Sequence, residues 1–349
     1  MSQSSNSQPA GLKKTKQRQS IIMLLIRERT WMMLFLFAAL LIVFAVHTDG
    51  RMIDRRNLMH ILNMMAVSTF LTQGVALLML SGKRDLSTGA NGTLCGIFLA
   101  FALREGMTLI PALLLTLAIG AIVGLLNAAL VNELNMAPFI ATLATSMIAT
   151  GFVILIAQNR IIPIRHAVLV GYGSHMLFGP AFARLGIDFP GVPVAAFIAF
   201  VFMAIIGVML KMTKFGRQIY LVGGNPQAAK LSGVNPKKMS YILFVICGLF
   251  SSAAGITLVS RLQSANMQGL VAQRFQGITA AVLGGISLGG GSGGMAGAFV
   301  GLLVLNTFTN GMTVSGIAPG WQHVASGGLL IFALTLDFFQ KRQNEKVVA

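Results

Sequence analysis

The stretch 215–233 combines residue types that could build a binding surface between two apolar segments. Asn225 before Pro226 is typical of a helix start, because an Asn side chain caps free backbone N–H groups and proline fits the first helical position. Gly233 is suited to end that helix. Lysines flank the small residues 228–229 on both sides. A solvated basic loop would explain these charges but not the capping residues, so we predict a short basic helix that contacts a soluble partner.

Other kinds of chemistry would need residues that the sequence does not bring together. The five histidines are scattered, and Cys95 and Cys247 lie in apolar segments without metal-ligand spacing. The phosphate-binding pattern G-x-x-x-x-G-K-[ST] is absent. Residues 289–294 (GGGSGG) formally match a dinucleotide-binding pattern, but they join two apolar segments. We expect no catalytic residue, no metal and no cofactor.

The apolar segments contain uncharged polar residues but no acidic residue in their interiors. Ion-coupled carriers usually place ionisable groups at membrane depth, so a coupling ion is a poor explanation for transport here. Amides and hydroxyls suit a passage for a neutral, hydroxyl-rich solute, although each one is more often an interhelical hydrogen-bonding group. The candidate path residues are Gln73, Ser87, Asn91, Thr142, Thr145, Gln276 and Asn306.

The elements that carry these residues are ten apolar segments, most of them long enough to cross the ~30 Å hydrocarbon core of a bilayer. Of the 349 residues, 55% are hydrophobic and only 10% are charged, far fewer than the roughly 25% charged residues of soluble domains. The net charge of +17 does not predict nucleic-acid binding, because the basic residues stand at segment ends. We therefore predict an all-α integral membrane protein with about ten transmembrane helices. The segments lie at about 31–46, 58–80, 86–103, 108–131, 138–157, 192–211, 240–260, 277–289, 295–312 and 321–338.

The basic residues predict which way the chain is inserted. An even number of crossings places both termini on one side, and with that side cytoplasmic every lysine is cytoplasmic. The long loop 158–189 is then external. The expected organisation is a cytoplasmic basic tail (1–29), a transmembrane domain (30–340) with a cytoplasmic loop at 212–239, and a second cytoplasmic tail (341–349).

Two segments are less regular than the others. The glycine-rich 86–103 and the short 277–289 are expected to be broken or re-entrant, which a membrane tolerates only where neighbouring protein satisfies the backbone. Asp85 is expected to cap the backbone at Ser87–Thr88. Small-xxx-small pairs predict close packing of helices within the bundle. These pairs are Gly92/Gly96, Gly120/Gly124 and Gly297/Gly301.

Four ordered stretches carry a resemblance to a known family. They are Asp85–Gly89 (DLSTG), Pro138–Leu143 (PFIATL), Gly223–Val234 (GGNPQAAKLSGV) and Ala280–Gly291 (AAVLGGISLGGG). In this order and spacing the chain resembles, from about Asn57 to Arg342, the ribose/galactose/xylose-type permeases of bacterial ABC sugar importers. These permeases belong to the branched-chain amino acid/monosaccharide permease superfamily.

The resemblance implies a multi-pass permease subunit of the bacterial inner membrane that forms the path for a monosaccharide or similar small polyol. It also implies three kinds of partner: a second permease subunit, cytoplasmic ABC ATPase subunits that hydrolyse the ATP, and a periplasmic sugar-binding protein. The chain is then a transporter component and not an enzyme. In such systems the cytoplasmic helix is seated in a cleft of the ATPase. The residues assigned to that contact are Gly224, Asn225, Pro226, Ala228, Ala229, Lys230 and Gly233. The alternative is a stand-alone secondary carrier or channel for a small neutral solute, which would need no ATPase.

Overall fold

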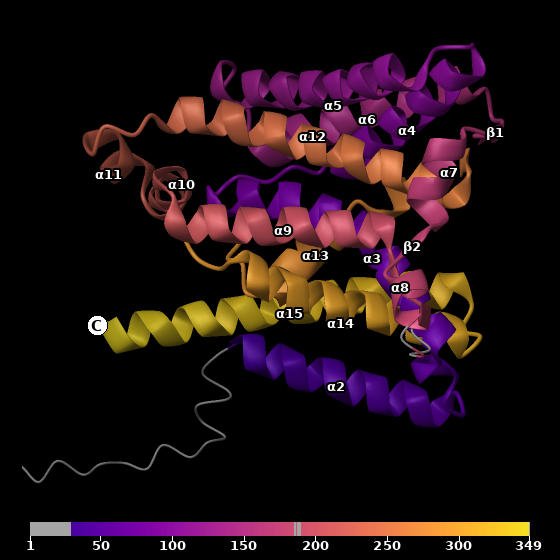
Figure 1. The fold of residues 1–349 in the computed structure, drawn as a ribbon. Helices are drawn as coiled ribbons and strands as arrows, with labels where there is room; N and C mark the ends of the chain where they lie inside the picture. The colour runs from indigo at the N-terminus through magenta and orange to yellow at the C-terminus, as the bar shows by residue number, and fades with distance from the viewer. Residues whose placement is uncertain (1–28, 185, 187–189, 349) are drawn as a thin grey trace, which may run out of the picture.

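The computed structural model describes residues 29–184, 186 and 190–348, which form a bundle of α-helices (Figure 1). The elements of the first half are α2 (Arg29–His47), η1 (Arg51–Ile53), α3 (Arg55–Leu80), α4 (Thr88–Arg104), α5 (Leu109–Asn132), α6 (Pro138–Ala157), β1 (Ile162–Pro163), α7 (Ala167–Ser174), β2 (Met176–Leu177) and α8 (Gly179–Arg184). Those of the second half are β3 (Val192–Pro193), α9 (Val194–Met212), α10 (Lys214–Gly224), α11 (Pro226–Leu231), α12 (Pro236–Leu262), β4 (Ser264–Ala265), η2 (Val271–Gln273), α13 (Gln276–Leu283), α14 (Met295–Val314) and α15 (Pro319–Val348).

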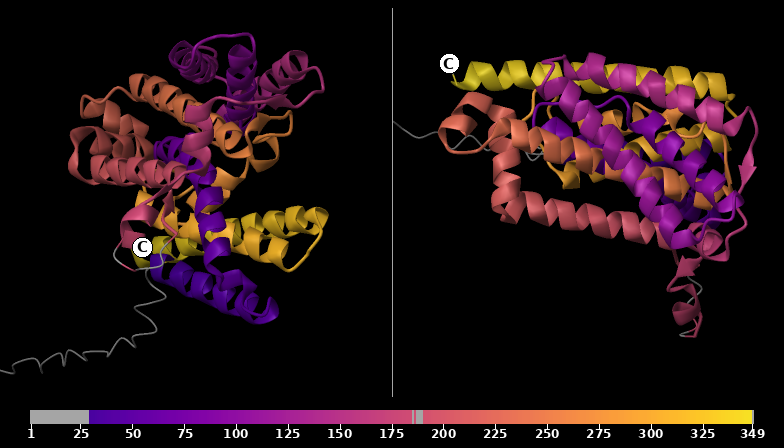
Figure 2. Two further views of the ribbon diagram at one scale, coloured as in Figure 1. Left: turned by 45° about the vertical axis from the view of Figure 1, so that its right-hand side comes forward. Right: turned by 90° about the horizontal axis from the view of Figure 1, so that it is seen from above.

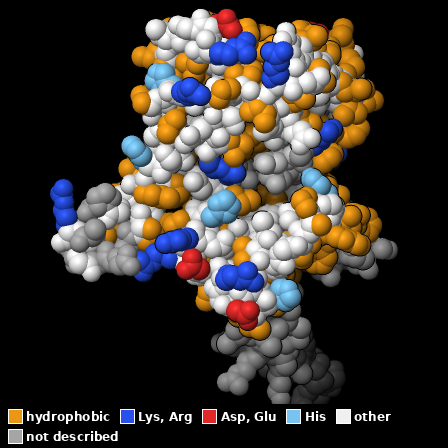
Figure 3. All heavy atoms as spheres, turned by 90° about the vertical axis from the view of Figure 1, so that its right-hand side faces the viewer, with side chains coloured by type: hydrophobic (Ala, Val, Ile, Leu, Met, Phe, Trp, Pro, Cys, Tyr) orange, Lys and Arg blue, Asp and Glu red, His pale blue; other side chains and the backbone are white. Residues whose placement is uncertain are grey.

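The two ends of the bundle differ in structure. One end carries α10 and α11, and we call it the α10 end; the opposite end carries α7, α8 and β1, and we call it the α7 end (Figure 1). The loop predicted to be external (158–189) and the loop predicted to be cytoplasmic (212–239) therefore lie at opposite ends. Figure 3 looks onto the α7 end, where basic and histidine side chains are spread over a mixed surface and hydrophobic side chains gather at its margins.

Two small antiparallel sheets organise the α7 end. Strand β1 pairs with β4, which places Ile162 opposite Ala265. Strand β2 pairs with β3, which places Met176 opposite Pro193. These pairings tie the long connection between α6 and α9 to itself and to the end of α12.

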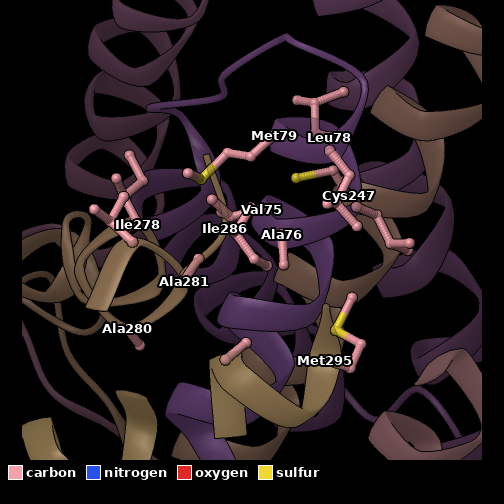
Figure 4. Close-up of a cluster of buried hydrophobic side chains, with 14 of the residues drawn as sticks. Val75, Ala76, Leu78, Met79, Cys247, Ile278, Ala280, Ala281, Ile286 and Met295 are labelled. Carbon is pink, nitrogen blue, oxygen red and sulfur yellow. The ribbon is translucent and has the colours of Figure 1, made fainter. Parts of the chain in front are cut away.

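Helix α3 is the centre of the bundle, because every residue from Met65 to Leu80 is buried. A helix that is buried all round has no solvated polar face, and the polar residues of this stretch, such as Ser68 and Gln73, are buried with the rest. Helix α12 packs along α3, α4 and α5, while α13 and α14 cover another side of α3. Figure 4 shows part of this core, with Val75 and Ala76 close to Ile286 of the connection that follows α13.

Glycines allow the helices of this core to approach closely. A Cβ on Gly120 or Gly124 of α5 would clash with backbone or side-chain atoms of α12. At the crossing of α4 with α12, a Cβ on Gly92 would stand 2.8 Å from the Ser251 carbonyl oxygen. Gly297 and Gly301 of α14 leave no space for a Cβ against α13 and Gly284 after it. All three predicted glycine pairs are therefore confirmed as packing sites inside one bundle.

Seven of the described helices are long and apolar enough to cross a membrane: α2, α3, α5, α6, α9, α12 and α14. The other three predicted crossings correspond to α4, α13 and α15. Helix α13 has only 8 residues, which at 1.5 Å per residue gives about 12 Å and less than half of the hydrocarbon core. Helix α15 is long, but Gln322, His323 and Asp337 interrupt its apolar sequence. For these three helices a complete crossing stays a prediction.

Helix α4 corrects part of the expectation about the 86–103 segment. We expected a broken or re-entrant helix there, and α4 is unbroken from Thr88 to Arg104, with only residues 86–87 outside the helix. A re-entrant position in the membrane stays a prediction. The glycines of α4 are compatible with a regular helix because α12 and the residues on either side of η2 cover them. The chain becomes irregular instead in the connection 81–87 before the helix.

The predicted tails have different outcomes. The N-terminal tail predicted at 1–29 lies outside the described residues, except that Arg29 begins α2. The C-terminal tail predicted at 341–349 continues α15 as far as Val348, so most of this tail extends the last helix.

Candidate docking site and solute path

Helix α11 begins with the capping residue that its sequence predicts. The side-chain oxygen of Asn225 accepts hydrogen bonds from the backbone N–H groups of Gln227 and Ala228, both at 3.0 Å, and Pro226 takes the first helical position. These bonds satisfy two of the N–H groups that a helix leaves free at its start. The helix start predicted at Asn225 is confirmed.

The end of α11 is fixed by Gly233, whose φ is +81°. The Gly233 N–H donates to the Lys230 carbonyl at 3.1 Å, and the Val234 N–H donates to the Ala229 carbonyl at 3.0 Å. This pair of bonds is a Schellman motif, which needs a left-handed residue that glycine supplies without strain. Both ends of this short helix are thus set by local sequence.

Helix α10 is a feature that sequence reasoning missed, because we treated residues 212–224 as part of a loop. The Thr213 hydroxyl accepts a hydrogen bond from the Gly216 N–H at 3.1 Å and starts the helix. Ile219 and Val222, three positions apart, lie in the core cluster of the bundle, and the basic residues on the helix are exposed. That i, i+3 apolar pair after a threonine cap was the available signal. Helix α10 turns sharply away from the axis of α9 (Figure 2).

The surface that α11 offers differs from the one we expected. Ala229 has no exposed area and packs into the core cluster, and Ala228 is half-buried. Leu231, the last helical residue, is 91% exposed, and Gln227 and Lys230 are exposed beside it. Of the two alanines assigned to a partner contact, Ala229 is therefore a packing residue of this chain.

Glycines from three segments meet behind α10, and we call Gly82, Gly223, Gly290 and Gly291 the glycine junction. The Gly291 N–H donates to the carbonyl of Leu80 at 2.9 Å. A Cβ on Gly223 would clash with that same carbonyl, and one on Gly290 would stand 2.6 Å from the Gly82 nitrogen. The junction seats the end of α10 against the end of α3 and against the loop before α14.

The GGGSGG stretch (289–294) therefore has a packing role. Two side chains hold the loop around it: the Tyr220 hydroxyl of α10 donates to the Gly293 carbonyl at 2.8 Å, and the Arg84 guanidinium donates to the Leu288 carbonyl at 2.9 Å. Sequence reasoning excluded nucleotide binding at this stretch but did not find its partners. These partners were missed because a contact between two backbone segments requires no particular side chains and therefore produces no recognisable sequence pattern.

The connection between α3 and α4 contains a buried polar network. The carboxylate of Asp85 accepts hydrogen bonds from the Ser87 N–H at 2.7 Å and the Ser87 hydroxyl at 2.6 Å. The Asn127 amide donates to the Ser87 hydroxyl at 2.9 Å, and the Thr145 hydroxyl donates to Asn127 at 2.6 Å. Burial raises the pKa of the Asp85 carboxyl, and the Ser87 hydrogen bonds oppose this shift. Asp85 thus bonds the backbone of Ser87 as predicted, but Ser87 precedes α4 and the helix start carries no side-chain cap bond, so the predicted helix cap is confirmed only in part.

Lys83 is the charged neighbour of this network. Its ammonium group donates to the Asn132 side-chain oxygen at 2.8 Å and to the Ser240 hydroxyl at 2.7 Å, which joins the α3–α4 connection to α5 and α12. Because the side chain is partly buried, its pKa is lowered from 10.5 to about 8.

Five of the seven candidate path residues join elements of the bundle through hydrogen bonds. Ser87 and Thr145 belong to the Asp85 network. The Gln73 amide donates to the carbonyl of Ala199 in α9 at 2.7 Å, and the Asn91 amide donates to α5 at 3.4 Å. The Thr142 hydroxyl accepts from the backbone of the α3–α4 connection at 3.1 Å. All five link elements of the bundle, which fits the structural alternative for such residues.

Gln276 and Asn306 come together through Ser68, whose hydroxyl lies 3.3 Å from the side-chain oxygen of each. Gln276 also lines a cavity of about 350 Å³ between α13, α14 and α15, which we call the polar cavity. It lies toward the α7 end, where α14 ends and α15 begins. Its polar lining consists of Gln273, Gln276, Thr279, Thr309, Thr313, Gln322, His323 and Ser326. Amides and hydroxyls predominate there, with one imidazole.

The described structure combines seven helices able to cross a membrane, buried polar groups paired between helices, and a solute-sized polar cavity. These features are those of an integral membrane protein with several membrane-spanning helices, and the family match gives its class as a transport permease. The chain belongs to the family described as branched-chain amino acid transport system / permease component, which matches residues 57–334. The family predicted from the four sequence stretches is confirmed, and the protein is a multi-pass permease of the bacterial inner membrane.

Sugar import permeases are among the similar proteins. The ribose import permease protein RbsC of Bacillus subtilis (strain 168) is 32% identical over 303 residues, which covers 87% of this chain and 91% of the relative. The galactose/methyl galactoside import permease protein MglC of Escherichia coli (strain K12) is 30% identical, covering 86% of this chain and 93% of the relative. The xylose transport system permease protein XylH of Haemophilus influenzae is 29% identical, covering 90% and 97%. No solved structure matches the chain.

Proposed function

We propose that this chain is the membrane-spanning permease subunit of a binding-protein-dependent ABC importer for a monosaccharide or similar small polyol. In this proposal it pairs with a second permease subunit and receives solute from a periplasmic sugar-binding protein. Cytoplasmic ATPase subunits hydrolyse the ATP, so the permease itself is not an enzyme. The names of the relatives, which are permeases for ribose, galactose and xylose, support this solute class.

The observation that carries the coupling role is the construction of α10 and α11. Helix α11 is capped at both ends by its own residues, and the glycine junction fixes α10 against α3. Such an element moves as a unit with the bundle when a partner pushes on it. Its tip presents the exposed Leu231 between exposed polar residues, and an apolar side chain at the centre of a polar rim is typical of an interface anchor.

Leu231→Glu tests this docking surface. We expect the variant to lose co-purification with its ATP-binding subunit and to lose sugar-stimulated ATP hydrolysis in proteoliposomes. The physical reason is that a carboxylate without a partner would be buried in an apolar contact, which costs several kcal/mol. The measurement is pull-down of the co-expressed ATPase, together with the ATPase rate.

Leu134→Glu is the matched control, because Leu134 lies in the connection after α5 and is 66% exposed. We expect this control to retain the ATPase. Equal retention by the Leu231→Glu variant, with normal import, would show that α11 is not the contact. Solute uptake by the permease without any ATPase would instead support the stand-alone carrier.

We also propose that the polar cavity forms part of the solute path. Its volume falls within the roughly 300–1,000 Å³ range of small-molecule sites, and amides and hydroxyls suit a sugar that must bind weakly and leave again. We expect Gln276→Leu to lower the import rate severalfold, because the solute loses one hydrogen-bonding group. The measurement is uptake of labelled sugar at a matched amount of inserted, ATPase-bound permease. Unchanged uptake would remove Gln276 from the path.

A further inference from the structure

A second cavity, of about 480 Å³, lies between α9, α10 and α14, and we call it the α9 groove. Most of its walls are apolar. Ala204 and Gly207 leave it open, since a Cβ added to Gly207 would meet only the Met295 side chain at 3.5 Å. The rings of Phe200 and Phe299 close one end, edge to face with 5.4 Å between their centres. The polar side chains Lys211 and Tyr220 stand at the other end.

The position of the groove matches one leaflet of a bilayer. From Phe200 to Lys211 the helix rises about 16 Å at 1.5 Å per residue, roughly half of the ~30 Å hydrocarbon core. Ala204, Val208 and Met212, each four residues apart, are exposed along it, so this side of α9 faces away from the bundle. The groove thus runs from the α10 end to about the middle of the membrane.

The groove is apolar in its deep part and basic at the α10 end, which matches the apolar acyl chains and charged headgroup of a phospholipid. Its deep part offers aliphatic and aromatic side chains that suit an acyl chain. At the α10 end the exposed Lys211 stands where the helix leaves the hydrocarbon core, and Lys214 is the first residue of α10. Anionic headgroups are attracted by basic residues placed at this depth.

We propose that the α9 groove binds one anionic phospholipid from the leaflet at the α10 end, with an acyl chain beside Gly207 and the phosphate beside Lys211. The lipid would contact Tyr220, whose hydroxyl holds the Gly293 carbonyl. The bound lipid therefore supports the contact between α10 and the loop before α14. The proposal does not depend on which solute the permease carries.

Native mass spectrometry of the full-length chain tests this, with phosphatidylglycerol and phosphatidylethanolamine of identical acyl chains added in turn. We expect the wild-type chain to retain phosphatidylglycerol several-fold more than phosphatidylethanolamine. Lys211→Gln should abolish this preference, whereas Lys238→Gln, at an exposed lysine on the same end but outside the groove, should keep it.

Gly207→Phe fills the groove and should reduce retention of both lipids. Ile205→Phe is its control, because Ile205 is exposed on the same helix but does not line the groove. Equal retention of the two lipids by the wild-type chain would overturn the proposal, as would unchanged retention by the Lys211→Gln and Gly207→Phe variants. Loss of a dimer peak in the Gly207→Phe spectra would also overturn it, because a second copy would then be the occupant.

Discussion

At the scale of single residues, Lys83 is an unusual cation because it is held by neutral partners. Asn132 and Ser240 accept its hydrogen bonds from two different helices, and within the part of the chain that the structure describes Lys83 forms no ion pair. Burial without a counter-charge disfavours the protonated amine, which is the physical origin of its low pKa. The contact thus joins three elements of the α10 end and depends on pH.

The pKa of Lys83 predicts a pH dependence of stability. In the folded chain it is about 8, compared with 10.5 for the ordinary side chain, so between these values the unfolded chain binds more protons. Stability then rises with pH through this window. We expect the apparent Tm of the wild-type chain in detergent to gain on that of a Lys83→Gln variant as pH increases from 7 to 10. A constant difference between the two melting curves would contradict this.

Gly223 is the residue of the glycine junction with the least space for a side chain. Gly223→Ala should destabilise the folded chain by about 1–3 kcal/mol, the usual cost of overpacking, because its Cβ would clash with the Leu80 carbonyl. Thermal unfolding in detergent measures this. Gly224→Ala is the matched comparison, since no atom lies within 4 Å of its added Cβ. Equal melting temperatures for the two variants would show that the backbone of the junction can shift to accommodate a Cβ without loss of stability.

At the scale of elements, local sequence predicted α11 well and α10 poorly. The start of α11 depends on Asn225 and its end on Gly233, and the bonds at both ends join residues at most five positions apart. Helix α10 is stabilised mainly by burial of Ile219 and Val222 against distant segments. The basic and glycine residues of α10 made its short apolar pattern difficult to recognise in the sequence. Capping is local chemistry, whereas docking of an amphipathic helix depends on what covers it.

The candidate path shows the same limit. Uncharged polar residues in apolar segments can be identified from sequence, but their partners cannot. Gln73 and Thr142 form hydrogen bonds with backbone groups of neighbouring elements, while Gln276 lines the polar cavity. The other cavity residues, such as Gln322 and Thr309, come from α14 and α15, which meet only in the folded bundle. The sequence therefore predicted the type of polar residue that lines the cavity but not where the cavity lies, and a role of these residues in a solute path stays a prediction.

At the scale of the whole molecule, the separation of the α10 and α7 ends agrees with the distribution of lysines. The lysines 83, 211, 214, 230, 237 and 238 all lie in segments of the α10 end. Long-range features such as hydrophobicity and charge asymmetry were thus enough to predict the ends of the bundle. Which end is cytoplasmic stays a prediction, made from the same lysines.

Cysteine labelling in intact cells tests that orientation. We expect Arg165→Cys to react with a membrane-impermeant maleimide and Lys214→Cys to react only after the cells are permeabilised. Both positions are exposed, and the native Cys95 and Cys247 are buried, so the background should be low. The opposite labelling pattern would invert the topology and would move α10 and α11 away from the ATP-containing compartment.

The glycine junction also has a consequence for biosynthesis. Gly291 follows Gly223 by about 70 residues in the chain, which a ribosome making roughly 5–20 residues per second needs several seconds to add. During that interval α10 and α11 have been made, but the loop that seats them has not. A nascent or prematurely terminated chain therefore presents α11 without its support. Completion of the surface that we propose docks the ATPase is thus tied to synthesis of the loop before α14, and chains truncated before this loop would be poor competitors for that subunit.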